Sequence, residues 1–178
     1  MATPSPGSPG AQLRWQFDLA WSLFDYHLQR LVPEDFLWAP GPLVWTMHRT
    51  PEGGWRPDWA NPEPDPIPVP TIGWVSWHLG WWWSTALDHA RGRTPRERTE
   101  IHWPGPGDPT IAWLRALHDD WCEVLDGADA DDLAAPAAYP WPADAGLRRA
   151  HLYAWANVEL TKNAGEIGQL RLLRAAAG

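Results

Sequence analysis

The chain has 178 residues and a formal net charge of -8, and 44% of its residues are hydrophobic. This length suits one domain with a packed core, and the acidic balance argues against a nucleic-acid-binding surface, which needs clustered Lys and Arg. The sequence contains no run of about 18 apolar residues, so no membrane span is predicted. The N-terminus has neither the basic region nor the apolar region of a signal peptide. The single cysteine, Cys122, excludes an intrachain disulfide and is expected to be a buried small residue. We therefore expect a cytoplasmic protein with neither nucleic acid nor membrane as a partner.

Residues 1–10 are rich in Pro, Ser and Gly and predict a disordered N-terminal tail, with the folded domain spanning 11–178. Apolar residues then recur at helical spacing from Leu13 to Leu31, and Pro33 marks the end of this segment. The sequence thus predicts a domain that starts with a helix.

The segment from Pro33 to Pro70 is too dense in Pro and Gly for a helix or an inner strand. Loops of more than about 12 to 15 residues in compact domains are usually functional or disordered, and disordered segments are poor in aromatic residues. This segment contains the tryptophans Trp38, Trp45, Trp55 and Trp59. We therefore expect a loop that packs on the body of the domain and roofs a site.

A second helix is predicted from a cap at Thr71 to about Gly92, and it is apolar on almost every side, which favours a central position in a bundle. His78 lies on one of its faces at helical spacing from Trp74, Trp81 and Thr85. A lone histidine on such a face is most often a core residue that is hydrogen-bonded to a neighbour. Its role therefore depends on the side chains that face it.

The connection from Arg91 to Gly107 is charged and rich in proline, and a solvated surface is expected there. A third helix is predicted from an N-cap at Asp108, with His118 on its inner stripe and no second residue at ligand spacing. A loop follows, and a fourth helix is predicted from a cap at Asp144 onward. Four long helices, long connections and no convincing strand predict an all-α four-helix bundle with a long Pro/Trp-rich loop between helices one and two.

The last helix has polar side chains on its apolar face. Glu159, Asn163 and Glu166 are spaced i, i+4 and i+7, so they stack one turn above the next and point inward together. A buried carboxylate costs several kcal/mol unless it is paired, hydrogen-bonded or bound to a cation. With His78 from the second helix, this set offers an imidazole, a carboxylate and further oxygen donors, which would suit a divalent first-row metal. From the residues alone, however, the set is interpreted as no more than a polar core network, because Asn is a poor ligand and Lys162 is adjacent in the sequence.

Three segments, WTM, TIGWVSWHLGWWW and NVELTKNAGEIGQLRLLR, resemble the DinB superfamily, also called DinB/YfiT-like. These four-helix proteins include thiol-dependent S-transferases and the mycothiol-dependent maleylpyruvate isomerase. The resemblance implies a divalent metal, often zinc or nickel, held by one histidine on helix two and a His-x-x-x-His pair on helix four. His78 matches the first ligand, and Gly165 with Glu166 matches the motif that trails the pair. Glu159 and Asn163 stand where the two histidines of the pair are expected.

Three functions remain open at this point. The first is a metal-dependent transferase or hydrolase that acts on a small molecule with or without a thiol, in which a metal at His78, Glu159 and Asn163 activates thiol or water. Glu166 would then support the metal or transfer a proton. The second is a non-catalytic small-molecule-binding protein with a degenerate, metal-free site, in which Glu159 or Glu166 pairs with His78 and raises its pKa. The third is a scaffold whose buried polar cluster only specifies packing.

The long Pro/Trp-rich segment enters the helix that carries His78, so we expect it to cap the mouth of the core site, with Trp55 and Trp59 lining an aromatic pocket. The alternative is that these tryptophans only attach the loop to the body. The residues expected to line the binding site are Trp45, Trp55, Trp59, Trp74, Trp81 and Glu166. The expected partner is a small-molecule substrate or ligand, and apolar faces on several helices are compatible with a homodimer.

Overall fold

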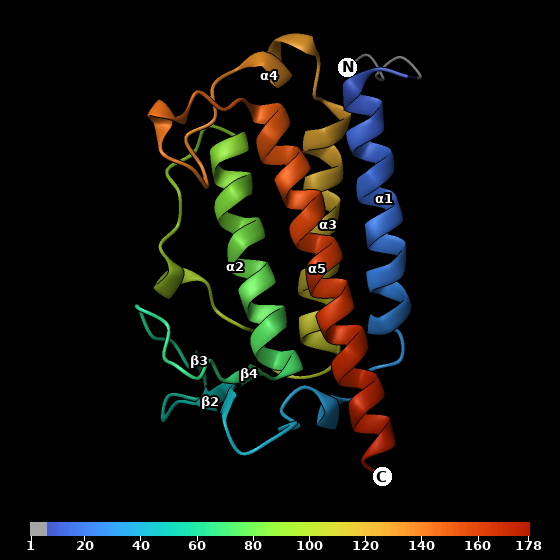
Figure 1. The fold of residues 1–178 in the computed structure, drawn as a ribbon, viewed down its shortest axis with the longest axis vertical. Coiled ribbons are helices and arrows are strands. Elements are labelled where there is room, and N and C mark those ends of the chain that lie inside the picture. The colour runs from blue at the N-terminus through green and yellow to red at the C-terminus, as the bar shows by residue number, and fades with distance from the viewer. Residues whose placement is uncertain (1–6) are drawn as a thin grey trace.

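Four long helices form the body of the computed structural model, which describes residues 7–178 (Figure 1). They are α1 (Pro9–Leu28), α2 (Ile72–Ala90), α3 (Asp108–Asp126) and α5 (Arg149–Ala176). α1 packs against α3 and α5, and α2 packs against the same two helices, so the apolar faces of all four meet in one core. The prediction of a mainly helical protein is confirmed. None of the helices in the described part of the chain combines the length and apolar character needed to cross a membrane.

α2 is covered on more than one side, as its apolar sequence predicted. Its residues are buried except for His78, Trp81, Trp82 and His89. On the side toward α3, a Cβ added at Gly80 would lie 1.8 Å from the ring of Trp113, so glycine is what allows this indole to lie against α2. The part of α2 that approaches the surface is therefore the strip that carries His78.

The first helix begins earlier than the sequence predicted. α1 starts at Pro9, where the hydroxyl oxygen of Ser8 accepts a hydrogen bond from the Ala11 N–H at 3.2 Å. The last two residues of the predicted tail are therefore helical, and residues 1–6 lie outside the described part of the chain.

Two predicted helix caps are wrong. Asp108 is the first residue of α3 itself, and the cap is Gly107, whose φ of 82° favours glycine. α5 begins after Asp144, which belongs to a separate short helix. At the true start of α5, the ring Nδ1 of His151 accepts a hydrogen bond from the Arg148 N–H at 3.0 Å. The prediction looked for Ser, Thr, Asp or Asn at the cap position, and a histidine ring is not one of these groups.

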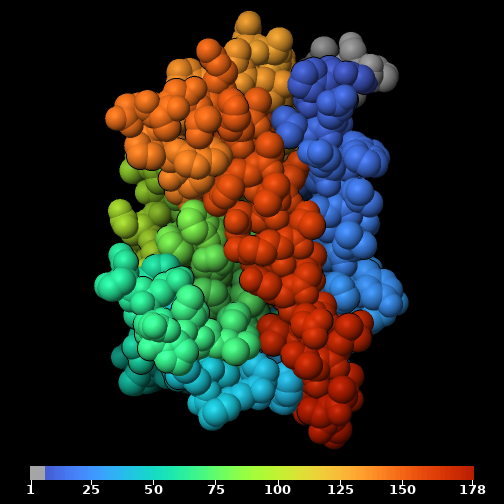
Figure 2. Space-filling view, in the orientation of Figure 1, coloured from blue at the N-terminus to red at the C-terminus, as the bar shows by residue number. Residues whose placement is uncertain are grey.

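The segment between α1 and α2 contains four short strands, so the prediction that it forms none is wrong. β1 (Val44–Trp45) pairs in parallel with β4 (Val69–Pro70), and β2 (Met47–Arg49) pairs antiparallel with β3 (Trp55–Pro57). Both strands of a two-stranded sheet are edges, which is where proline is tolerated. The segment gathers over the lower end of the molecule in the view of Figure 2, and its Trp45 is buried. A packed segment, rather than a disordered one, is therefore confirmed.

The remaining short elements are α4 (Ala130–Ala134) and the 3-10 helices η1 (Pro33–Asp35), η2 (Arg98–Glu100) and η3 (Ala143–Ala145). α4 lies in a connection that was predicted to be a loop. Its Asp132 accepts a hydrogen bond from the Tyr153 hydroxyl at 2.8 Å and forms an ion pair with Arg149. These contacts attach the connection to the first turns of α5.

Candidate functional site

His78 lies on the partly buried strip of α2 and is enclosed by indole rings. Trp74 stacks on its ring with centroids 4.8 Å apart, and the Nε1–H of Trp82 donates a hydrogen bond to its Nε2 at 2.6 Å. Burial first, and the nearby ammonium group of Lys162 second, lower the pKa of His78 to about 3. At neutral pH the imidazole is therefore uncharged, and its Nε2 lone pair is already engaged.

The acidic side chains of α5 share a lysine from their own helix. The carboxylate of Glu159 lies 2.6 Å from the ammonium group of Lys162. Glu166 is partly buried, and this burial raises its pKa, with Lys162 opposing the shift and Glu159 adding to it. Lys162 is thus paired with Glu159 and acts electrostatically on Glu166.

Asn163 is the most buried of the predicted polar residues, with no exposed surface. Its Nδ2 donates a hydrogen bond to the backbone carbonyl of Glu159 at 2.6 Å, whereas its Oδ1 has no partner among the described residues. A buried acceptor without a partner is costly, by about 1–3 kcal/mol. Of the predicted metal ligands, Asn163 is therefore the one with an unused oxygen in the interior.

Two of the three predicted metal ligands are engaged by other groups. Among the described residues, the one group of three His, Cys, Asp or Glu side chains with ligand atoms within 4.8 Å of one another lies elsewhere in the chain. Nε2 of His78 accepts the Trp82 hydrogen bond, and Glu159 is paired with Lys162. A tight divalent site needs several deprotonated, convergent donors. A metal at His78, Glu159 and Asn163 stays a prediction.

The predicted ion pair between His78 and a glutamate is wrong. Glu159 is paired with Lys162 instead, and the hydrogen bond to the His78 ring comes from Trp82. The pKa of His78 is lowered rather than raised, because the ring is desolvated among tryptophans.

A cavity of about 710 Å³ lies between the β2–β3 region and the segment around η2. Three tryptophans wall it, and the rings of Trp55 and Trp103 meet edge to face with centroids 5.0 Å apart. The guanidinium of Arg98 lies over the third, 4.6 Å from the ring centroid of Trp59. Trp55 and Trp59 thus share one cavity, and whether a ligand binds there stays a prediction.

This cavity is separated from His78, which is not among its lining residues. Trp59 meets Trp81 edge to face at 5.2 Å, and Trp81 meets the His78 ring edge to face at 5.8 Å. On another side, Trp45 stacks on Trp74 at 5.0 Å, and Trp74 stacks on His78. The long segment therefore reaches the imidazole only through indoles of α2, because its Trp45 and Trp59 contact Trp74 and Trp81, which in turn contact the ring. Trp81 separates the aromatic cavity from His78.

Two of the cavity residues, Arg98 and Trp103, were missed because the connection between α2 and α3 was expected to be a solvated surface. Instead, the guanidinium of Arg96 lies 2.8 Å from the buried carboxylate of Asp88 and holds this connection on α2. The signal in the sequence was a tryptophan in an otherwise charged, Pro-rich stretch. We call His78 of α2 with Glu159, Asn163 and Glu166 of α5 the α2 and α5 cluster. Two partners of this cluster were also missed, Trp82 and Lys162, which lie one helical turn from His78 and Glu159.

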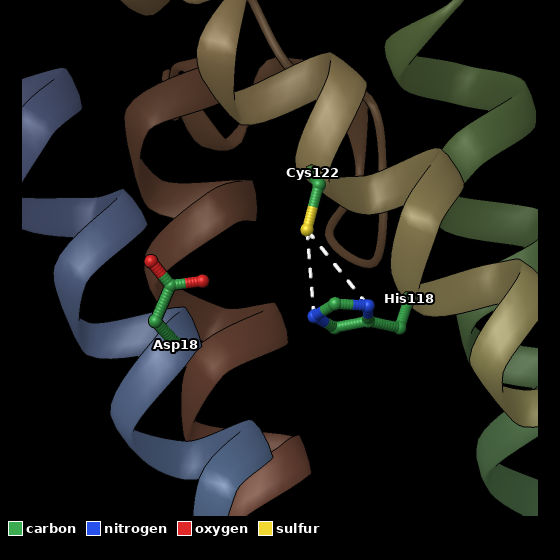
Figure 3. A group of neighbouring side chains, drawn as sticks. All are labelled: Asp18, His118 and Cys122. Carbon is green, nitrogen blue, oxygen red and sulfur yellow. Dashed lines mark hydrogen bonds between the residues drawn. The ribbon is translucent and has the colours of Figure 1, made fainter.

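A second group of metal-ligand side chains lies between α1 and α3 (Figure 3). It consists of Asp18 from α1 with His118 and Cys122 from α3, and their ligand atoms lie within 4.8 Å of one another. The prediction that no residue at ligand spacing accompanies His118 is wrong, because Cys122 follows one turn later and its Sγ lies 3.4 Å from Nε2. Asp18 comes from another helix, so helical periodicity could not have found it.

Comparison with known proteins identifies the family. The family model of the DinB superfamily matches residues 16–167, a range that holds α2, α3 and most of α1 and α5. No curated protein and no solved structure matches the chain. The matched range includes His78, Glu159 and Glu166, the residues on which the resemblance was read. The chain belongs to the DinB superfamily.

Proposed function

We propose that this chain is a small-molecule-binding protein built on the four-helix architecture of its superfamily, and that its ligand binds in the cavity walled by Trp55, Trp59 and Trp103. The cavity itself carries this proposal. Its volume of about 710 Å³ lies in the range of small-molecule sites, which are concave and lined by aromatic side chains with a few polar groups. Loops positioned by a rigid helical body commonly hold such sites.

The charges around the cavity favour an organic anion. Arg56 and Arg98 line it, and within the described residues neither lies within 4.0 Å of a carboxylate. The cavity has two acidic lining residues, Glu52 and Asp58. Asp58 is engaged internally, because its oxygens contact the Thr46 N–H at 2.9 Å and Nε2 of His48 at 2.8 Å, which leaves two guanidinium groups against one carboxylate. Guanidinium groups bind carboxylate and phosphate in a fork geometry. The proposed ligand is therefore a small molecule with a planar apolar body and an acidic group.

Tryptophan fluorescence titrated with aromatic carboxylates and phosphate esters tests this proposal. We expect a saturable change that Trp59→Ala and Arg98→Ala weaken at least tenfold, since stacking or the anion contact is lost in each. Trp15→Ala is the matched control, because Trp15 is 64% exposed on α1 and does not line the cavity. No saturable response, or equal binding by Trp59→Ala and wild type, would rule the proposal out.

The second candidate is a transferase or hydrolase of the kind that the superfamily includes, centred on the α2 and α5 cluster. Two observations favour it: the unpartnered Oδ1 of Asn163, and Glu166, whose raised pKa suits proton transfer. Elemental analysis of protein purified without an affinity tag decides whether a metal belongs there. Stoichiometric metal that is lost in His78→Gln supports this candidate, and metal that persists in that variant counts against it.

A further inference from the structure

We propose that the chain binds one zinc-type divalent metal ion between α1 and α3, with Cys122 Sγ, His118 Nε2 and the Asp18 carboxylate as its protein ligands. In Figure 3 the carboxylate of Asp18 faces the two α3 side chains across the gap between the helices. The three ligand atoms lie within 4.8 Å of one another. This group shares no residue with the α2 and α5 cluster or with the aromatic cavity.

The distance between the two α3 ligands matches that expected in a metal site. Sγ of Cys122 lies 3.4 Å from Nε2 of His118. With Zn–S of about 2.3 Å and Zn–N of about 2.0 Å at a tetrahedral angle, sulfur and nitrogen would be about 3.5 Å apart. Without metal, the same distance accommodates an S–H···N hydrogen bond. Sγ also lies 3.9 Å from Nδ1, so it is off the lone-pair axis of Nε2, and metal binding requires the His118 ring to turn while the α3 backbone stays in place.

Asp119 selects which nitrogen of His118 is free to bind a metal. Its Oδ1 lies 3.0 Å from Nδ1 of His118, which places the ring proton on Nδ1 and leaves the Nε2 lone pair free. Metal-binding histidines are typically oriented by a carboxylate in this way. The ring also stacks on Trp21, with centroids 4.1 Å apart, and on Phe17 at 5.4 Å.

The surrounding charges favour a cation. The carboxylates whose negative charge acts on the thiol are those of Asp18, Asp126 and Asp119, and the one cation that acts on it is Arg14. Arg14 is occupied, because its Nε lies 3.0 Å from Asp18 Oδ1 and its terminal nitrogen contacts Asp126. The second oxygen of Asp18 therefore remains available for a metal.

Metal binding converts the Cys122 thiol into a thiolate. A coordinated thiol is deprotonated by the metal charge, so binding exchanges the S–H bond for an S–metal bond and releases one proton to solvent. No oxidation or reduction is involved.

The donor set selects the class of ion. Thiolate and imidazole favour zinc-type ions over magnesium or calcium, which prefer sites made of oxygen atoms. Three protein ligands leave the fourth tetrahedral position for water, and Asp18 is exposed on that side of the molecule. We therefore expect an exchangeable site rather than a closed structural one.

Titration of the reduced, tag-free full chain with Co²⁺ tests the assignment. We expect the visible bands of tetrahedral Co²⁺ and a sulfur-to-cobalt charge-transfer band, saturating at one equivalent and displaced by Zn²⁺. Cys122→Ser should abolish the charge-transfer band, and His78→Gln, the matched control at the other cluster, should leave it unchanged. A band that survives in Cys122→Ser, or that is lost in His78→Gln, overturns the proposal.

Two further measurements do not depend on changing a metal ligand. Asp119→Asn should weaken Co²⁺ binding about 10- to 100-fold while keeping the charge-transfer band, as expected for a residue that positions His118. In the unsubstituted chain, Zn²⁺ should slow alkylation of the single thiol at least tenfold. Alkylation at the same rate with and without Zn²⁺ shows that no metal binds at Cys122.

Discussion

Nε1 of Trp82 lies 2.6 Å from Nε2 of His78, one turn away on α2, and the indole donates a hydrogen bond to the imidazole. An indole nitrogen can only donate, so Nε2 must keep its lone pair and the ring proton must be on Nδ1. Protonating Nε2 would break this bond and place a charge among tryptophan rings near the ammonium group of Lys162. The neutral imidazole is therefore a structural element of the α2 surface.

The variant His78→Gln should lose less stability in acid than the wild type. The pKa of His78 is about 3 in the folded chain and about 6.5 in the unfolded one. Between these values the unfolded state binds more protons, so stability decreases as the pH falls from 6.5 toward 3. Gln does not titrate and can accept the Trp82 hydrogen bond. Between pH 7 and pH 4.5, the free energy of unfolding measured in urea should fall by about 1–3 kcal/mol more in the wild type than in His78→Gln.

The other charged groups near His78 do not obscure this comparison. Glu166, whose pKa is raised by burial, acts in the opposite direction, because its contribution is present below its unfolded pKa and is lost as the pH rises through its folded pKa. Glu166, Glu159 and Lys162 are present in both proteins, so their effects largely cancel. Identical pH profiles for the two proteins would mean that His78 is protonated as readily in the folded chain as in the unfolded one.

Replacing Lys162 with Met should raise the pKa of both His78 and Glu166. The ammonium group of Lys162 lowers the pKa of each, so removing it makes the protonated form of each group less unfavourable. NMR titration of the imidazole and of the Glu166 carboxyl carbon measures both shifts. Lys162→Arg, which keeps the charge, should leave them near the wild-type values.

The effect of Lys162→Met on stability should be small. The side chain of Lys162 is 45% exposed, so solvent screens its pair with Glu159 and the loss should be about 1 kcal/mol or less. A larger loss of stability would mean that the carboxylate of Glu159 behaves as a buried charge that depends on its pair with Lys162. Unchanged pKa values in the Met variant would show that Lys162 does not act on the cluster.

Helical periodicity predicted α1, α2, α3 and α5 because each helix buries one broad face or more. It failed at the helix ends, where Gly107 and the ring of His151 replace the usual side-chain caps. It also placed Glu159 and Asn163 on an inward face without showing that Lys162 would fold back to one of them. The pairing of Lys162 with Glu159 depends on the rotamer of the long lysine side chain rather than on the spacing of the residues.

The two remaining sites depend on contacts between distant parts of the chain. The cavity joins Trp55 and Trp59 to Trp103 and Arg98, and the α1 and α3 group joins Asp18 to His118. Periodicity within one segment carries no information on such pairs. What the sequence did contain was the i, i+4 spacing of His118 and Cys122, which α3 turns into a contact of 3.4 Å.

Arg96→Ala should destabilise the chain by about 1–3 kcal/mol, because it leaves the carboxylate of Asp88, which is 4% exposed, without its ion-pair partner. Asp88→Asn in the Arg96→Ala background should recover part of this loss, since a neutral amide costs less to bury than an unpaired carboxylate. Urea unfolding of both single variants and the double variant gives the coupling energy. Strictly additive effects would contradict a role for this pair in holding the connection that carries Arg98.

Glycine at positions 80 and 165 should respond to alanine in opposite directions. A Cβ at Gly80 would lie 1.8 Å from the ring of Trp113, which is partly buried and packs against the core, so the ring would have to shift and Gly80→Ala should cost about 1–3 kcal/mol. Gly165 is exposed within α5, and nothing lies within 4 Å of an added Cβ. Gly165→Ala should therefore stabilise by up to about 1 kcal/mol, because alanine is the better helix former. Thermal unfolding of both variants measures this contrast, and a neutral Gly80→Ala would mean that α3 does not pack on α2 through Trp113.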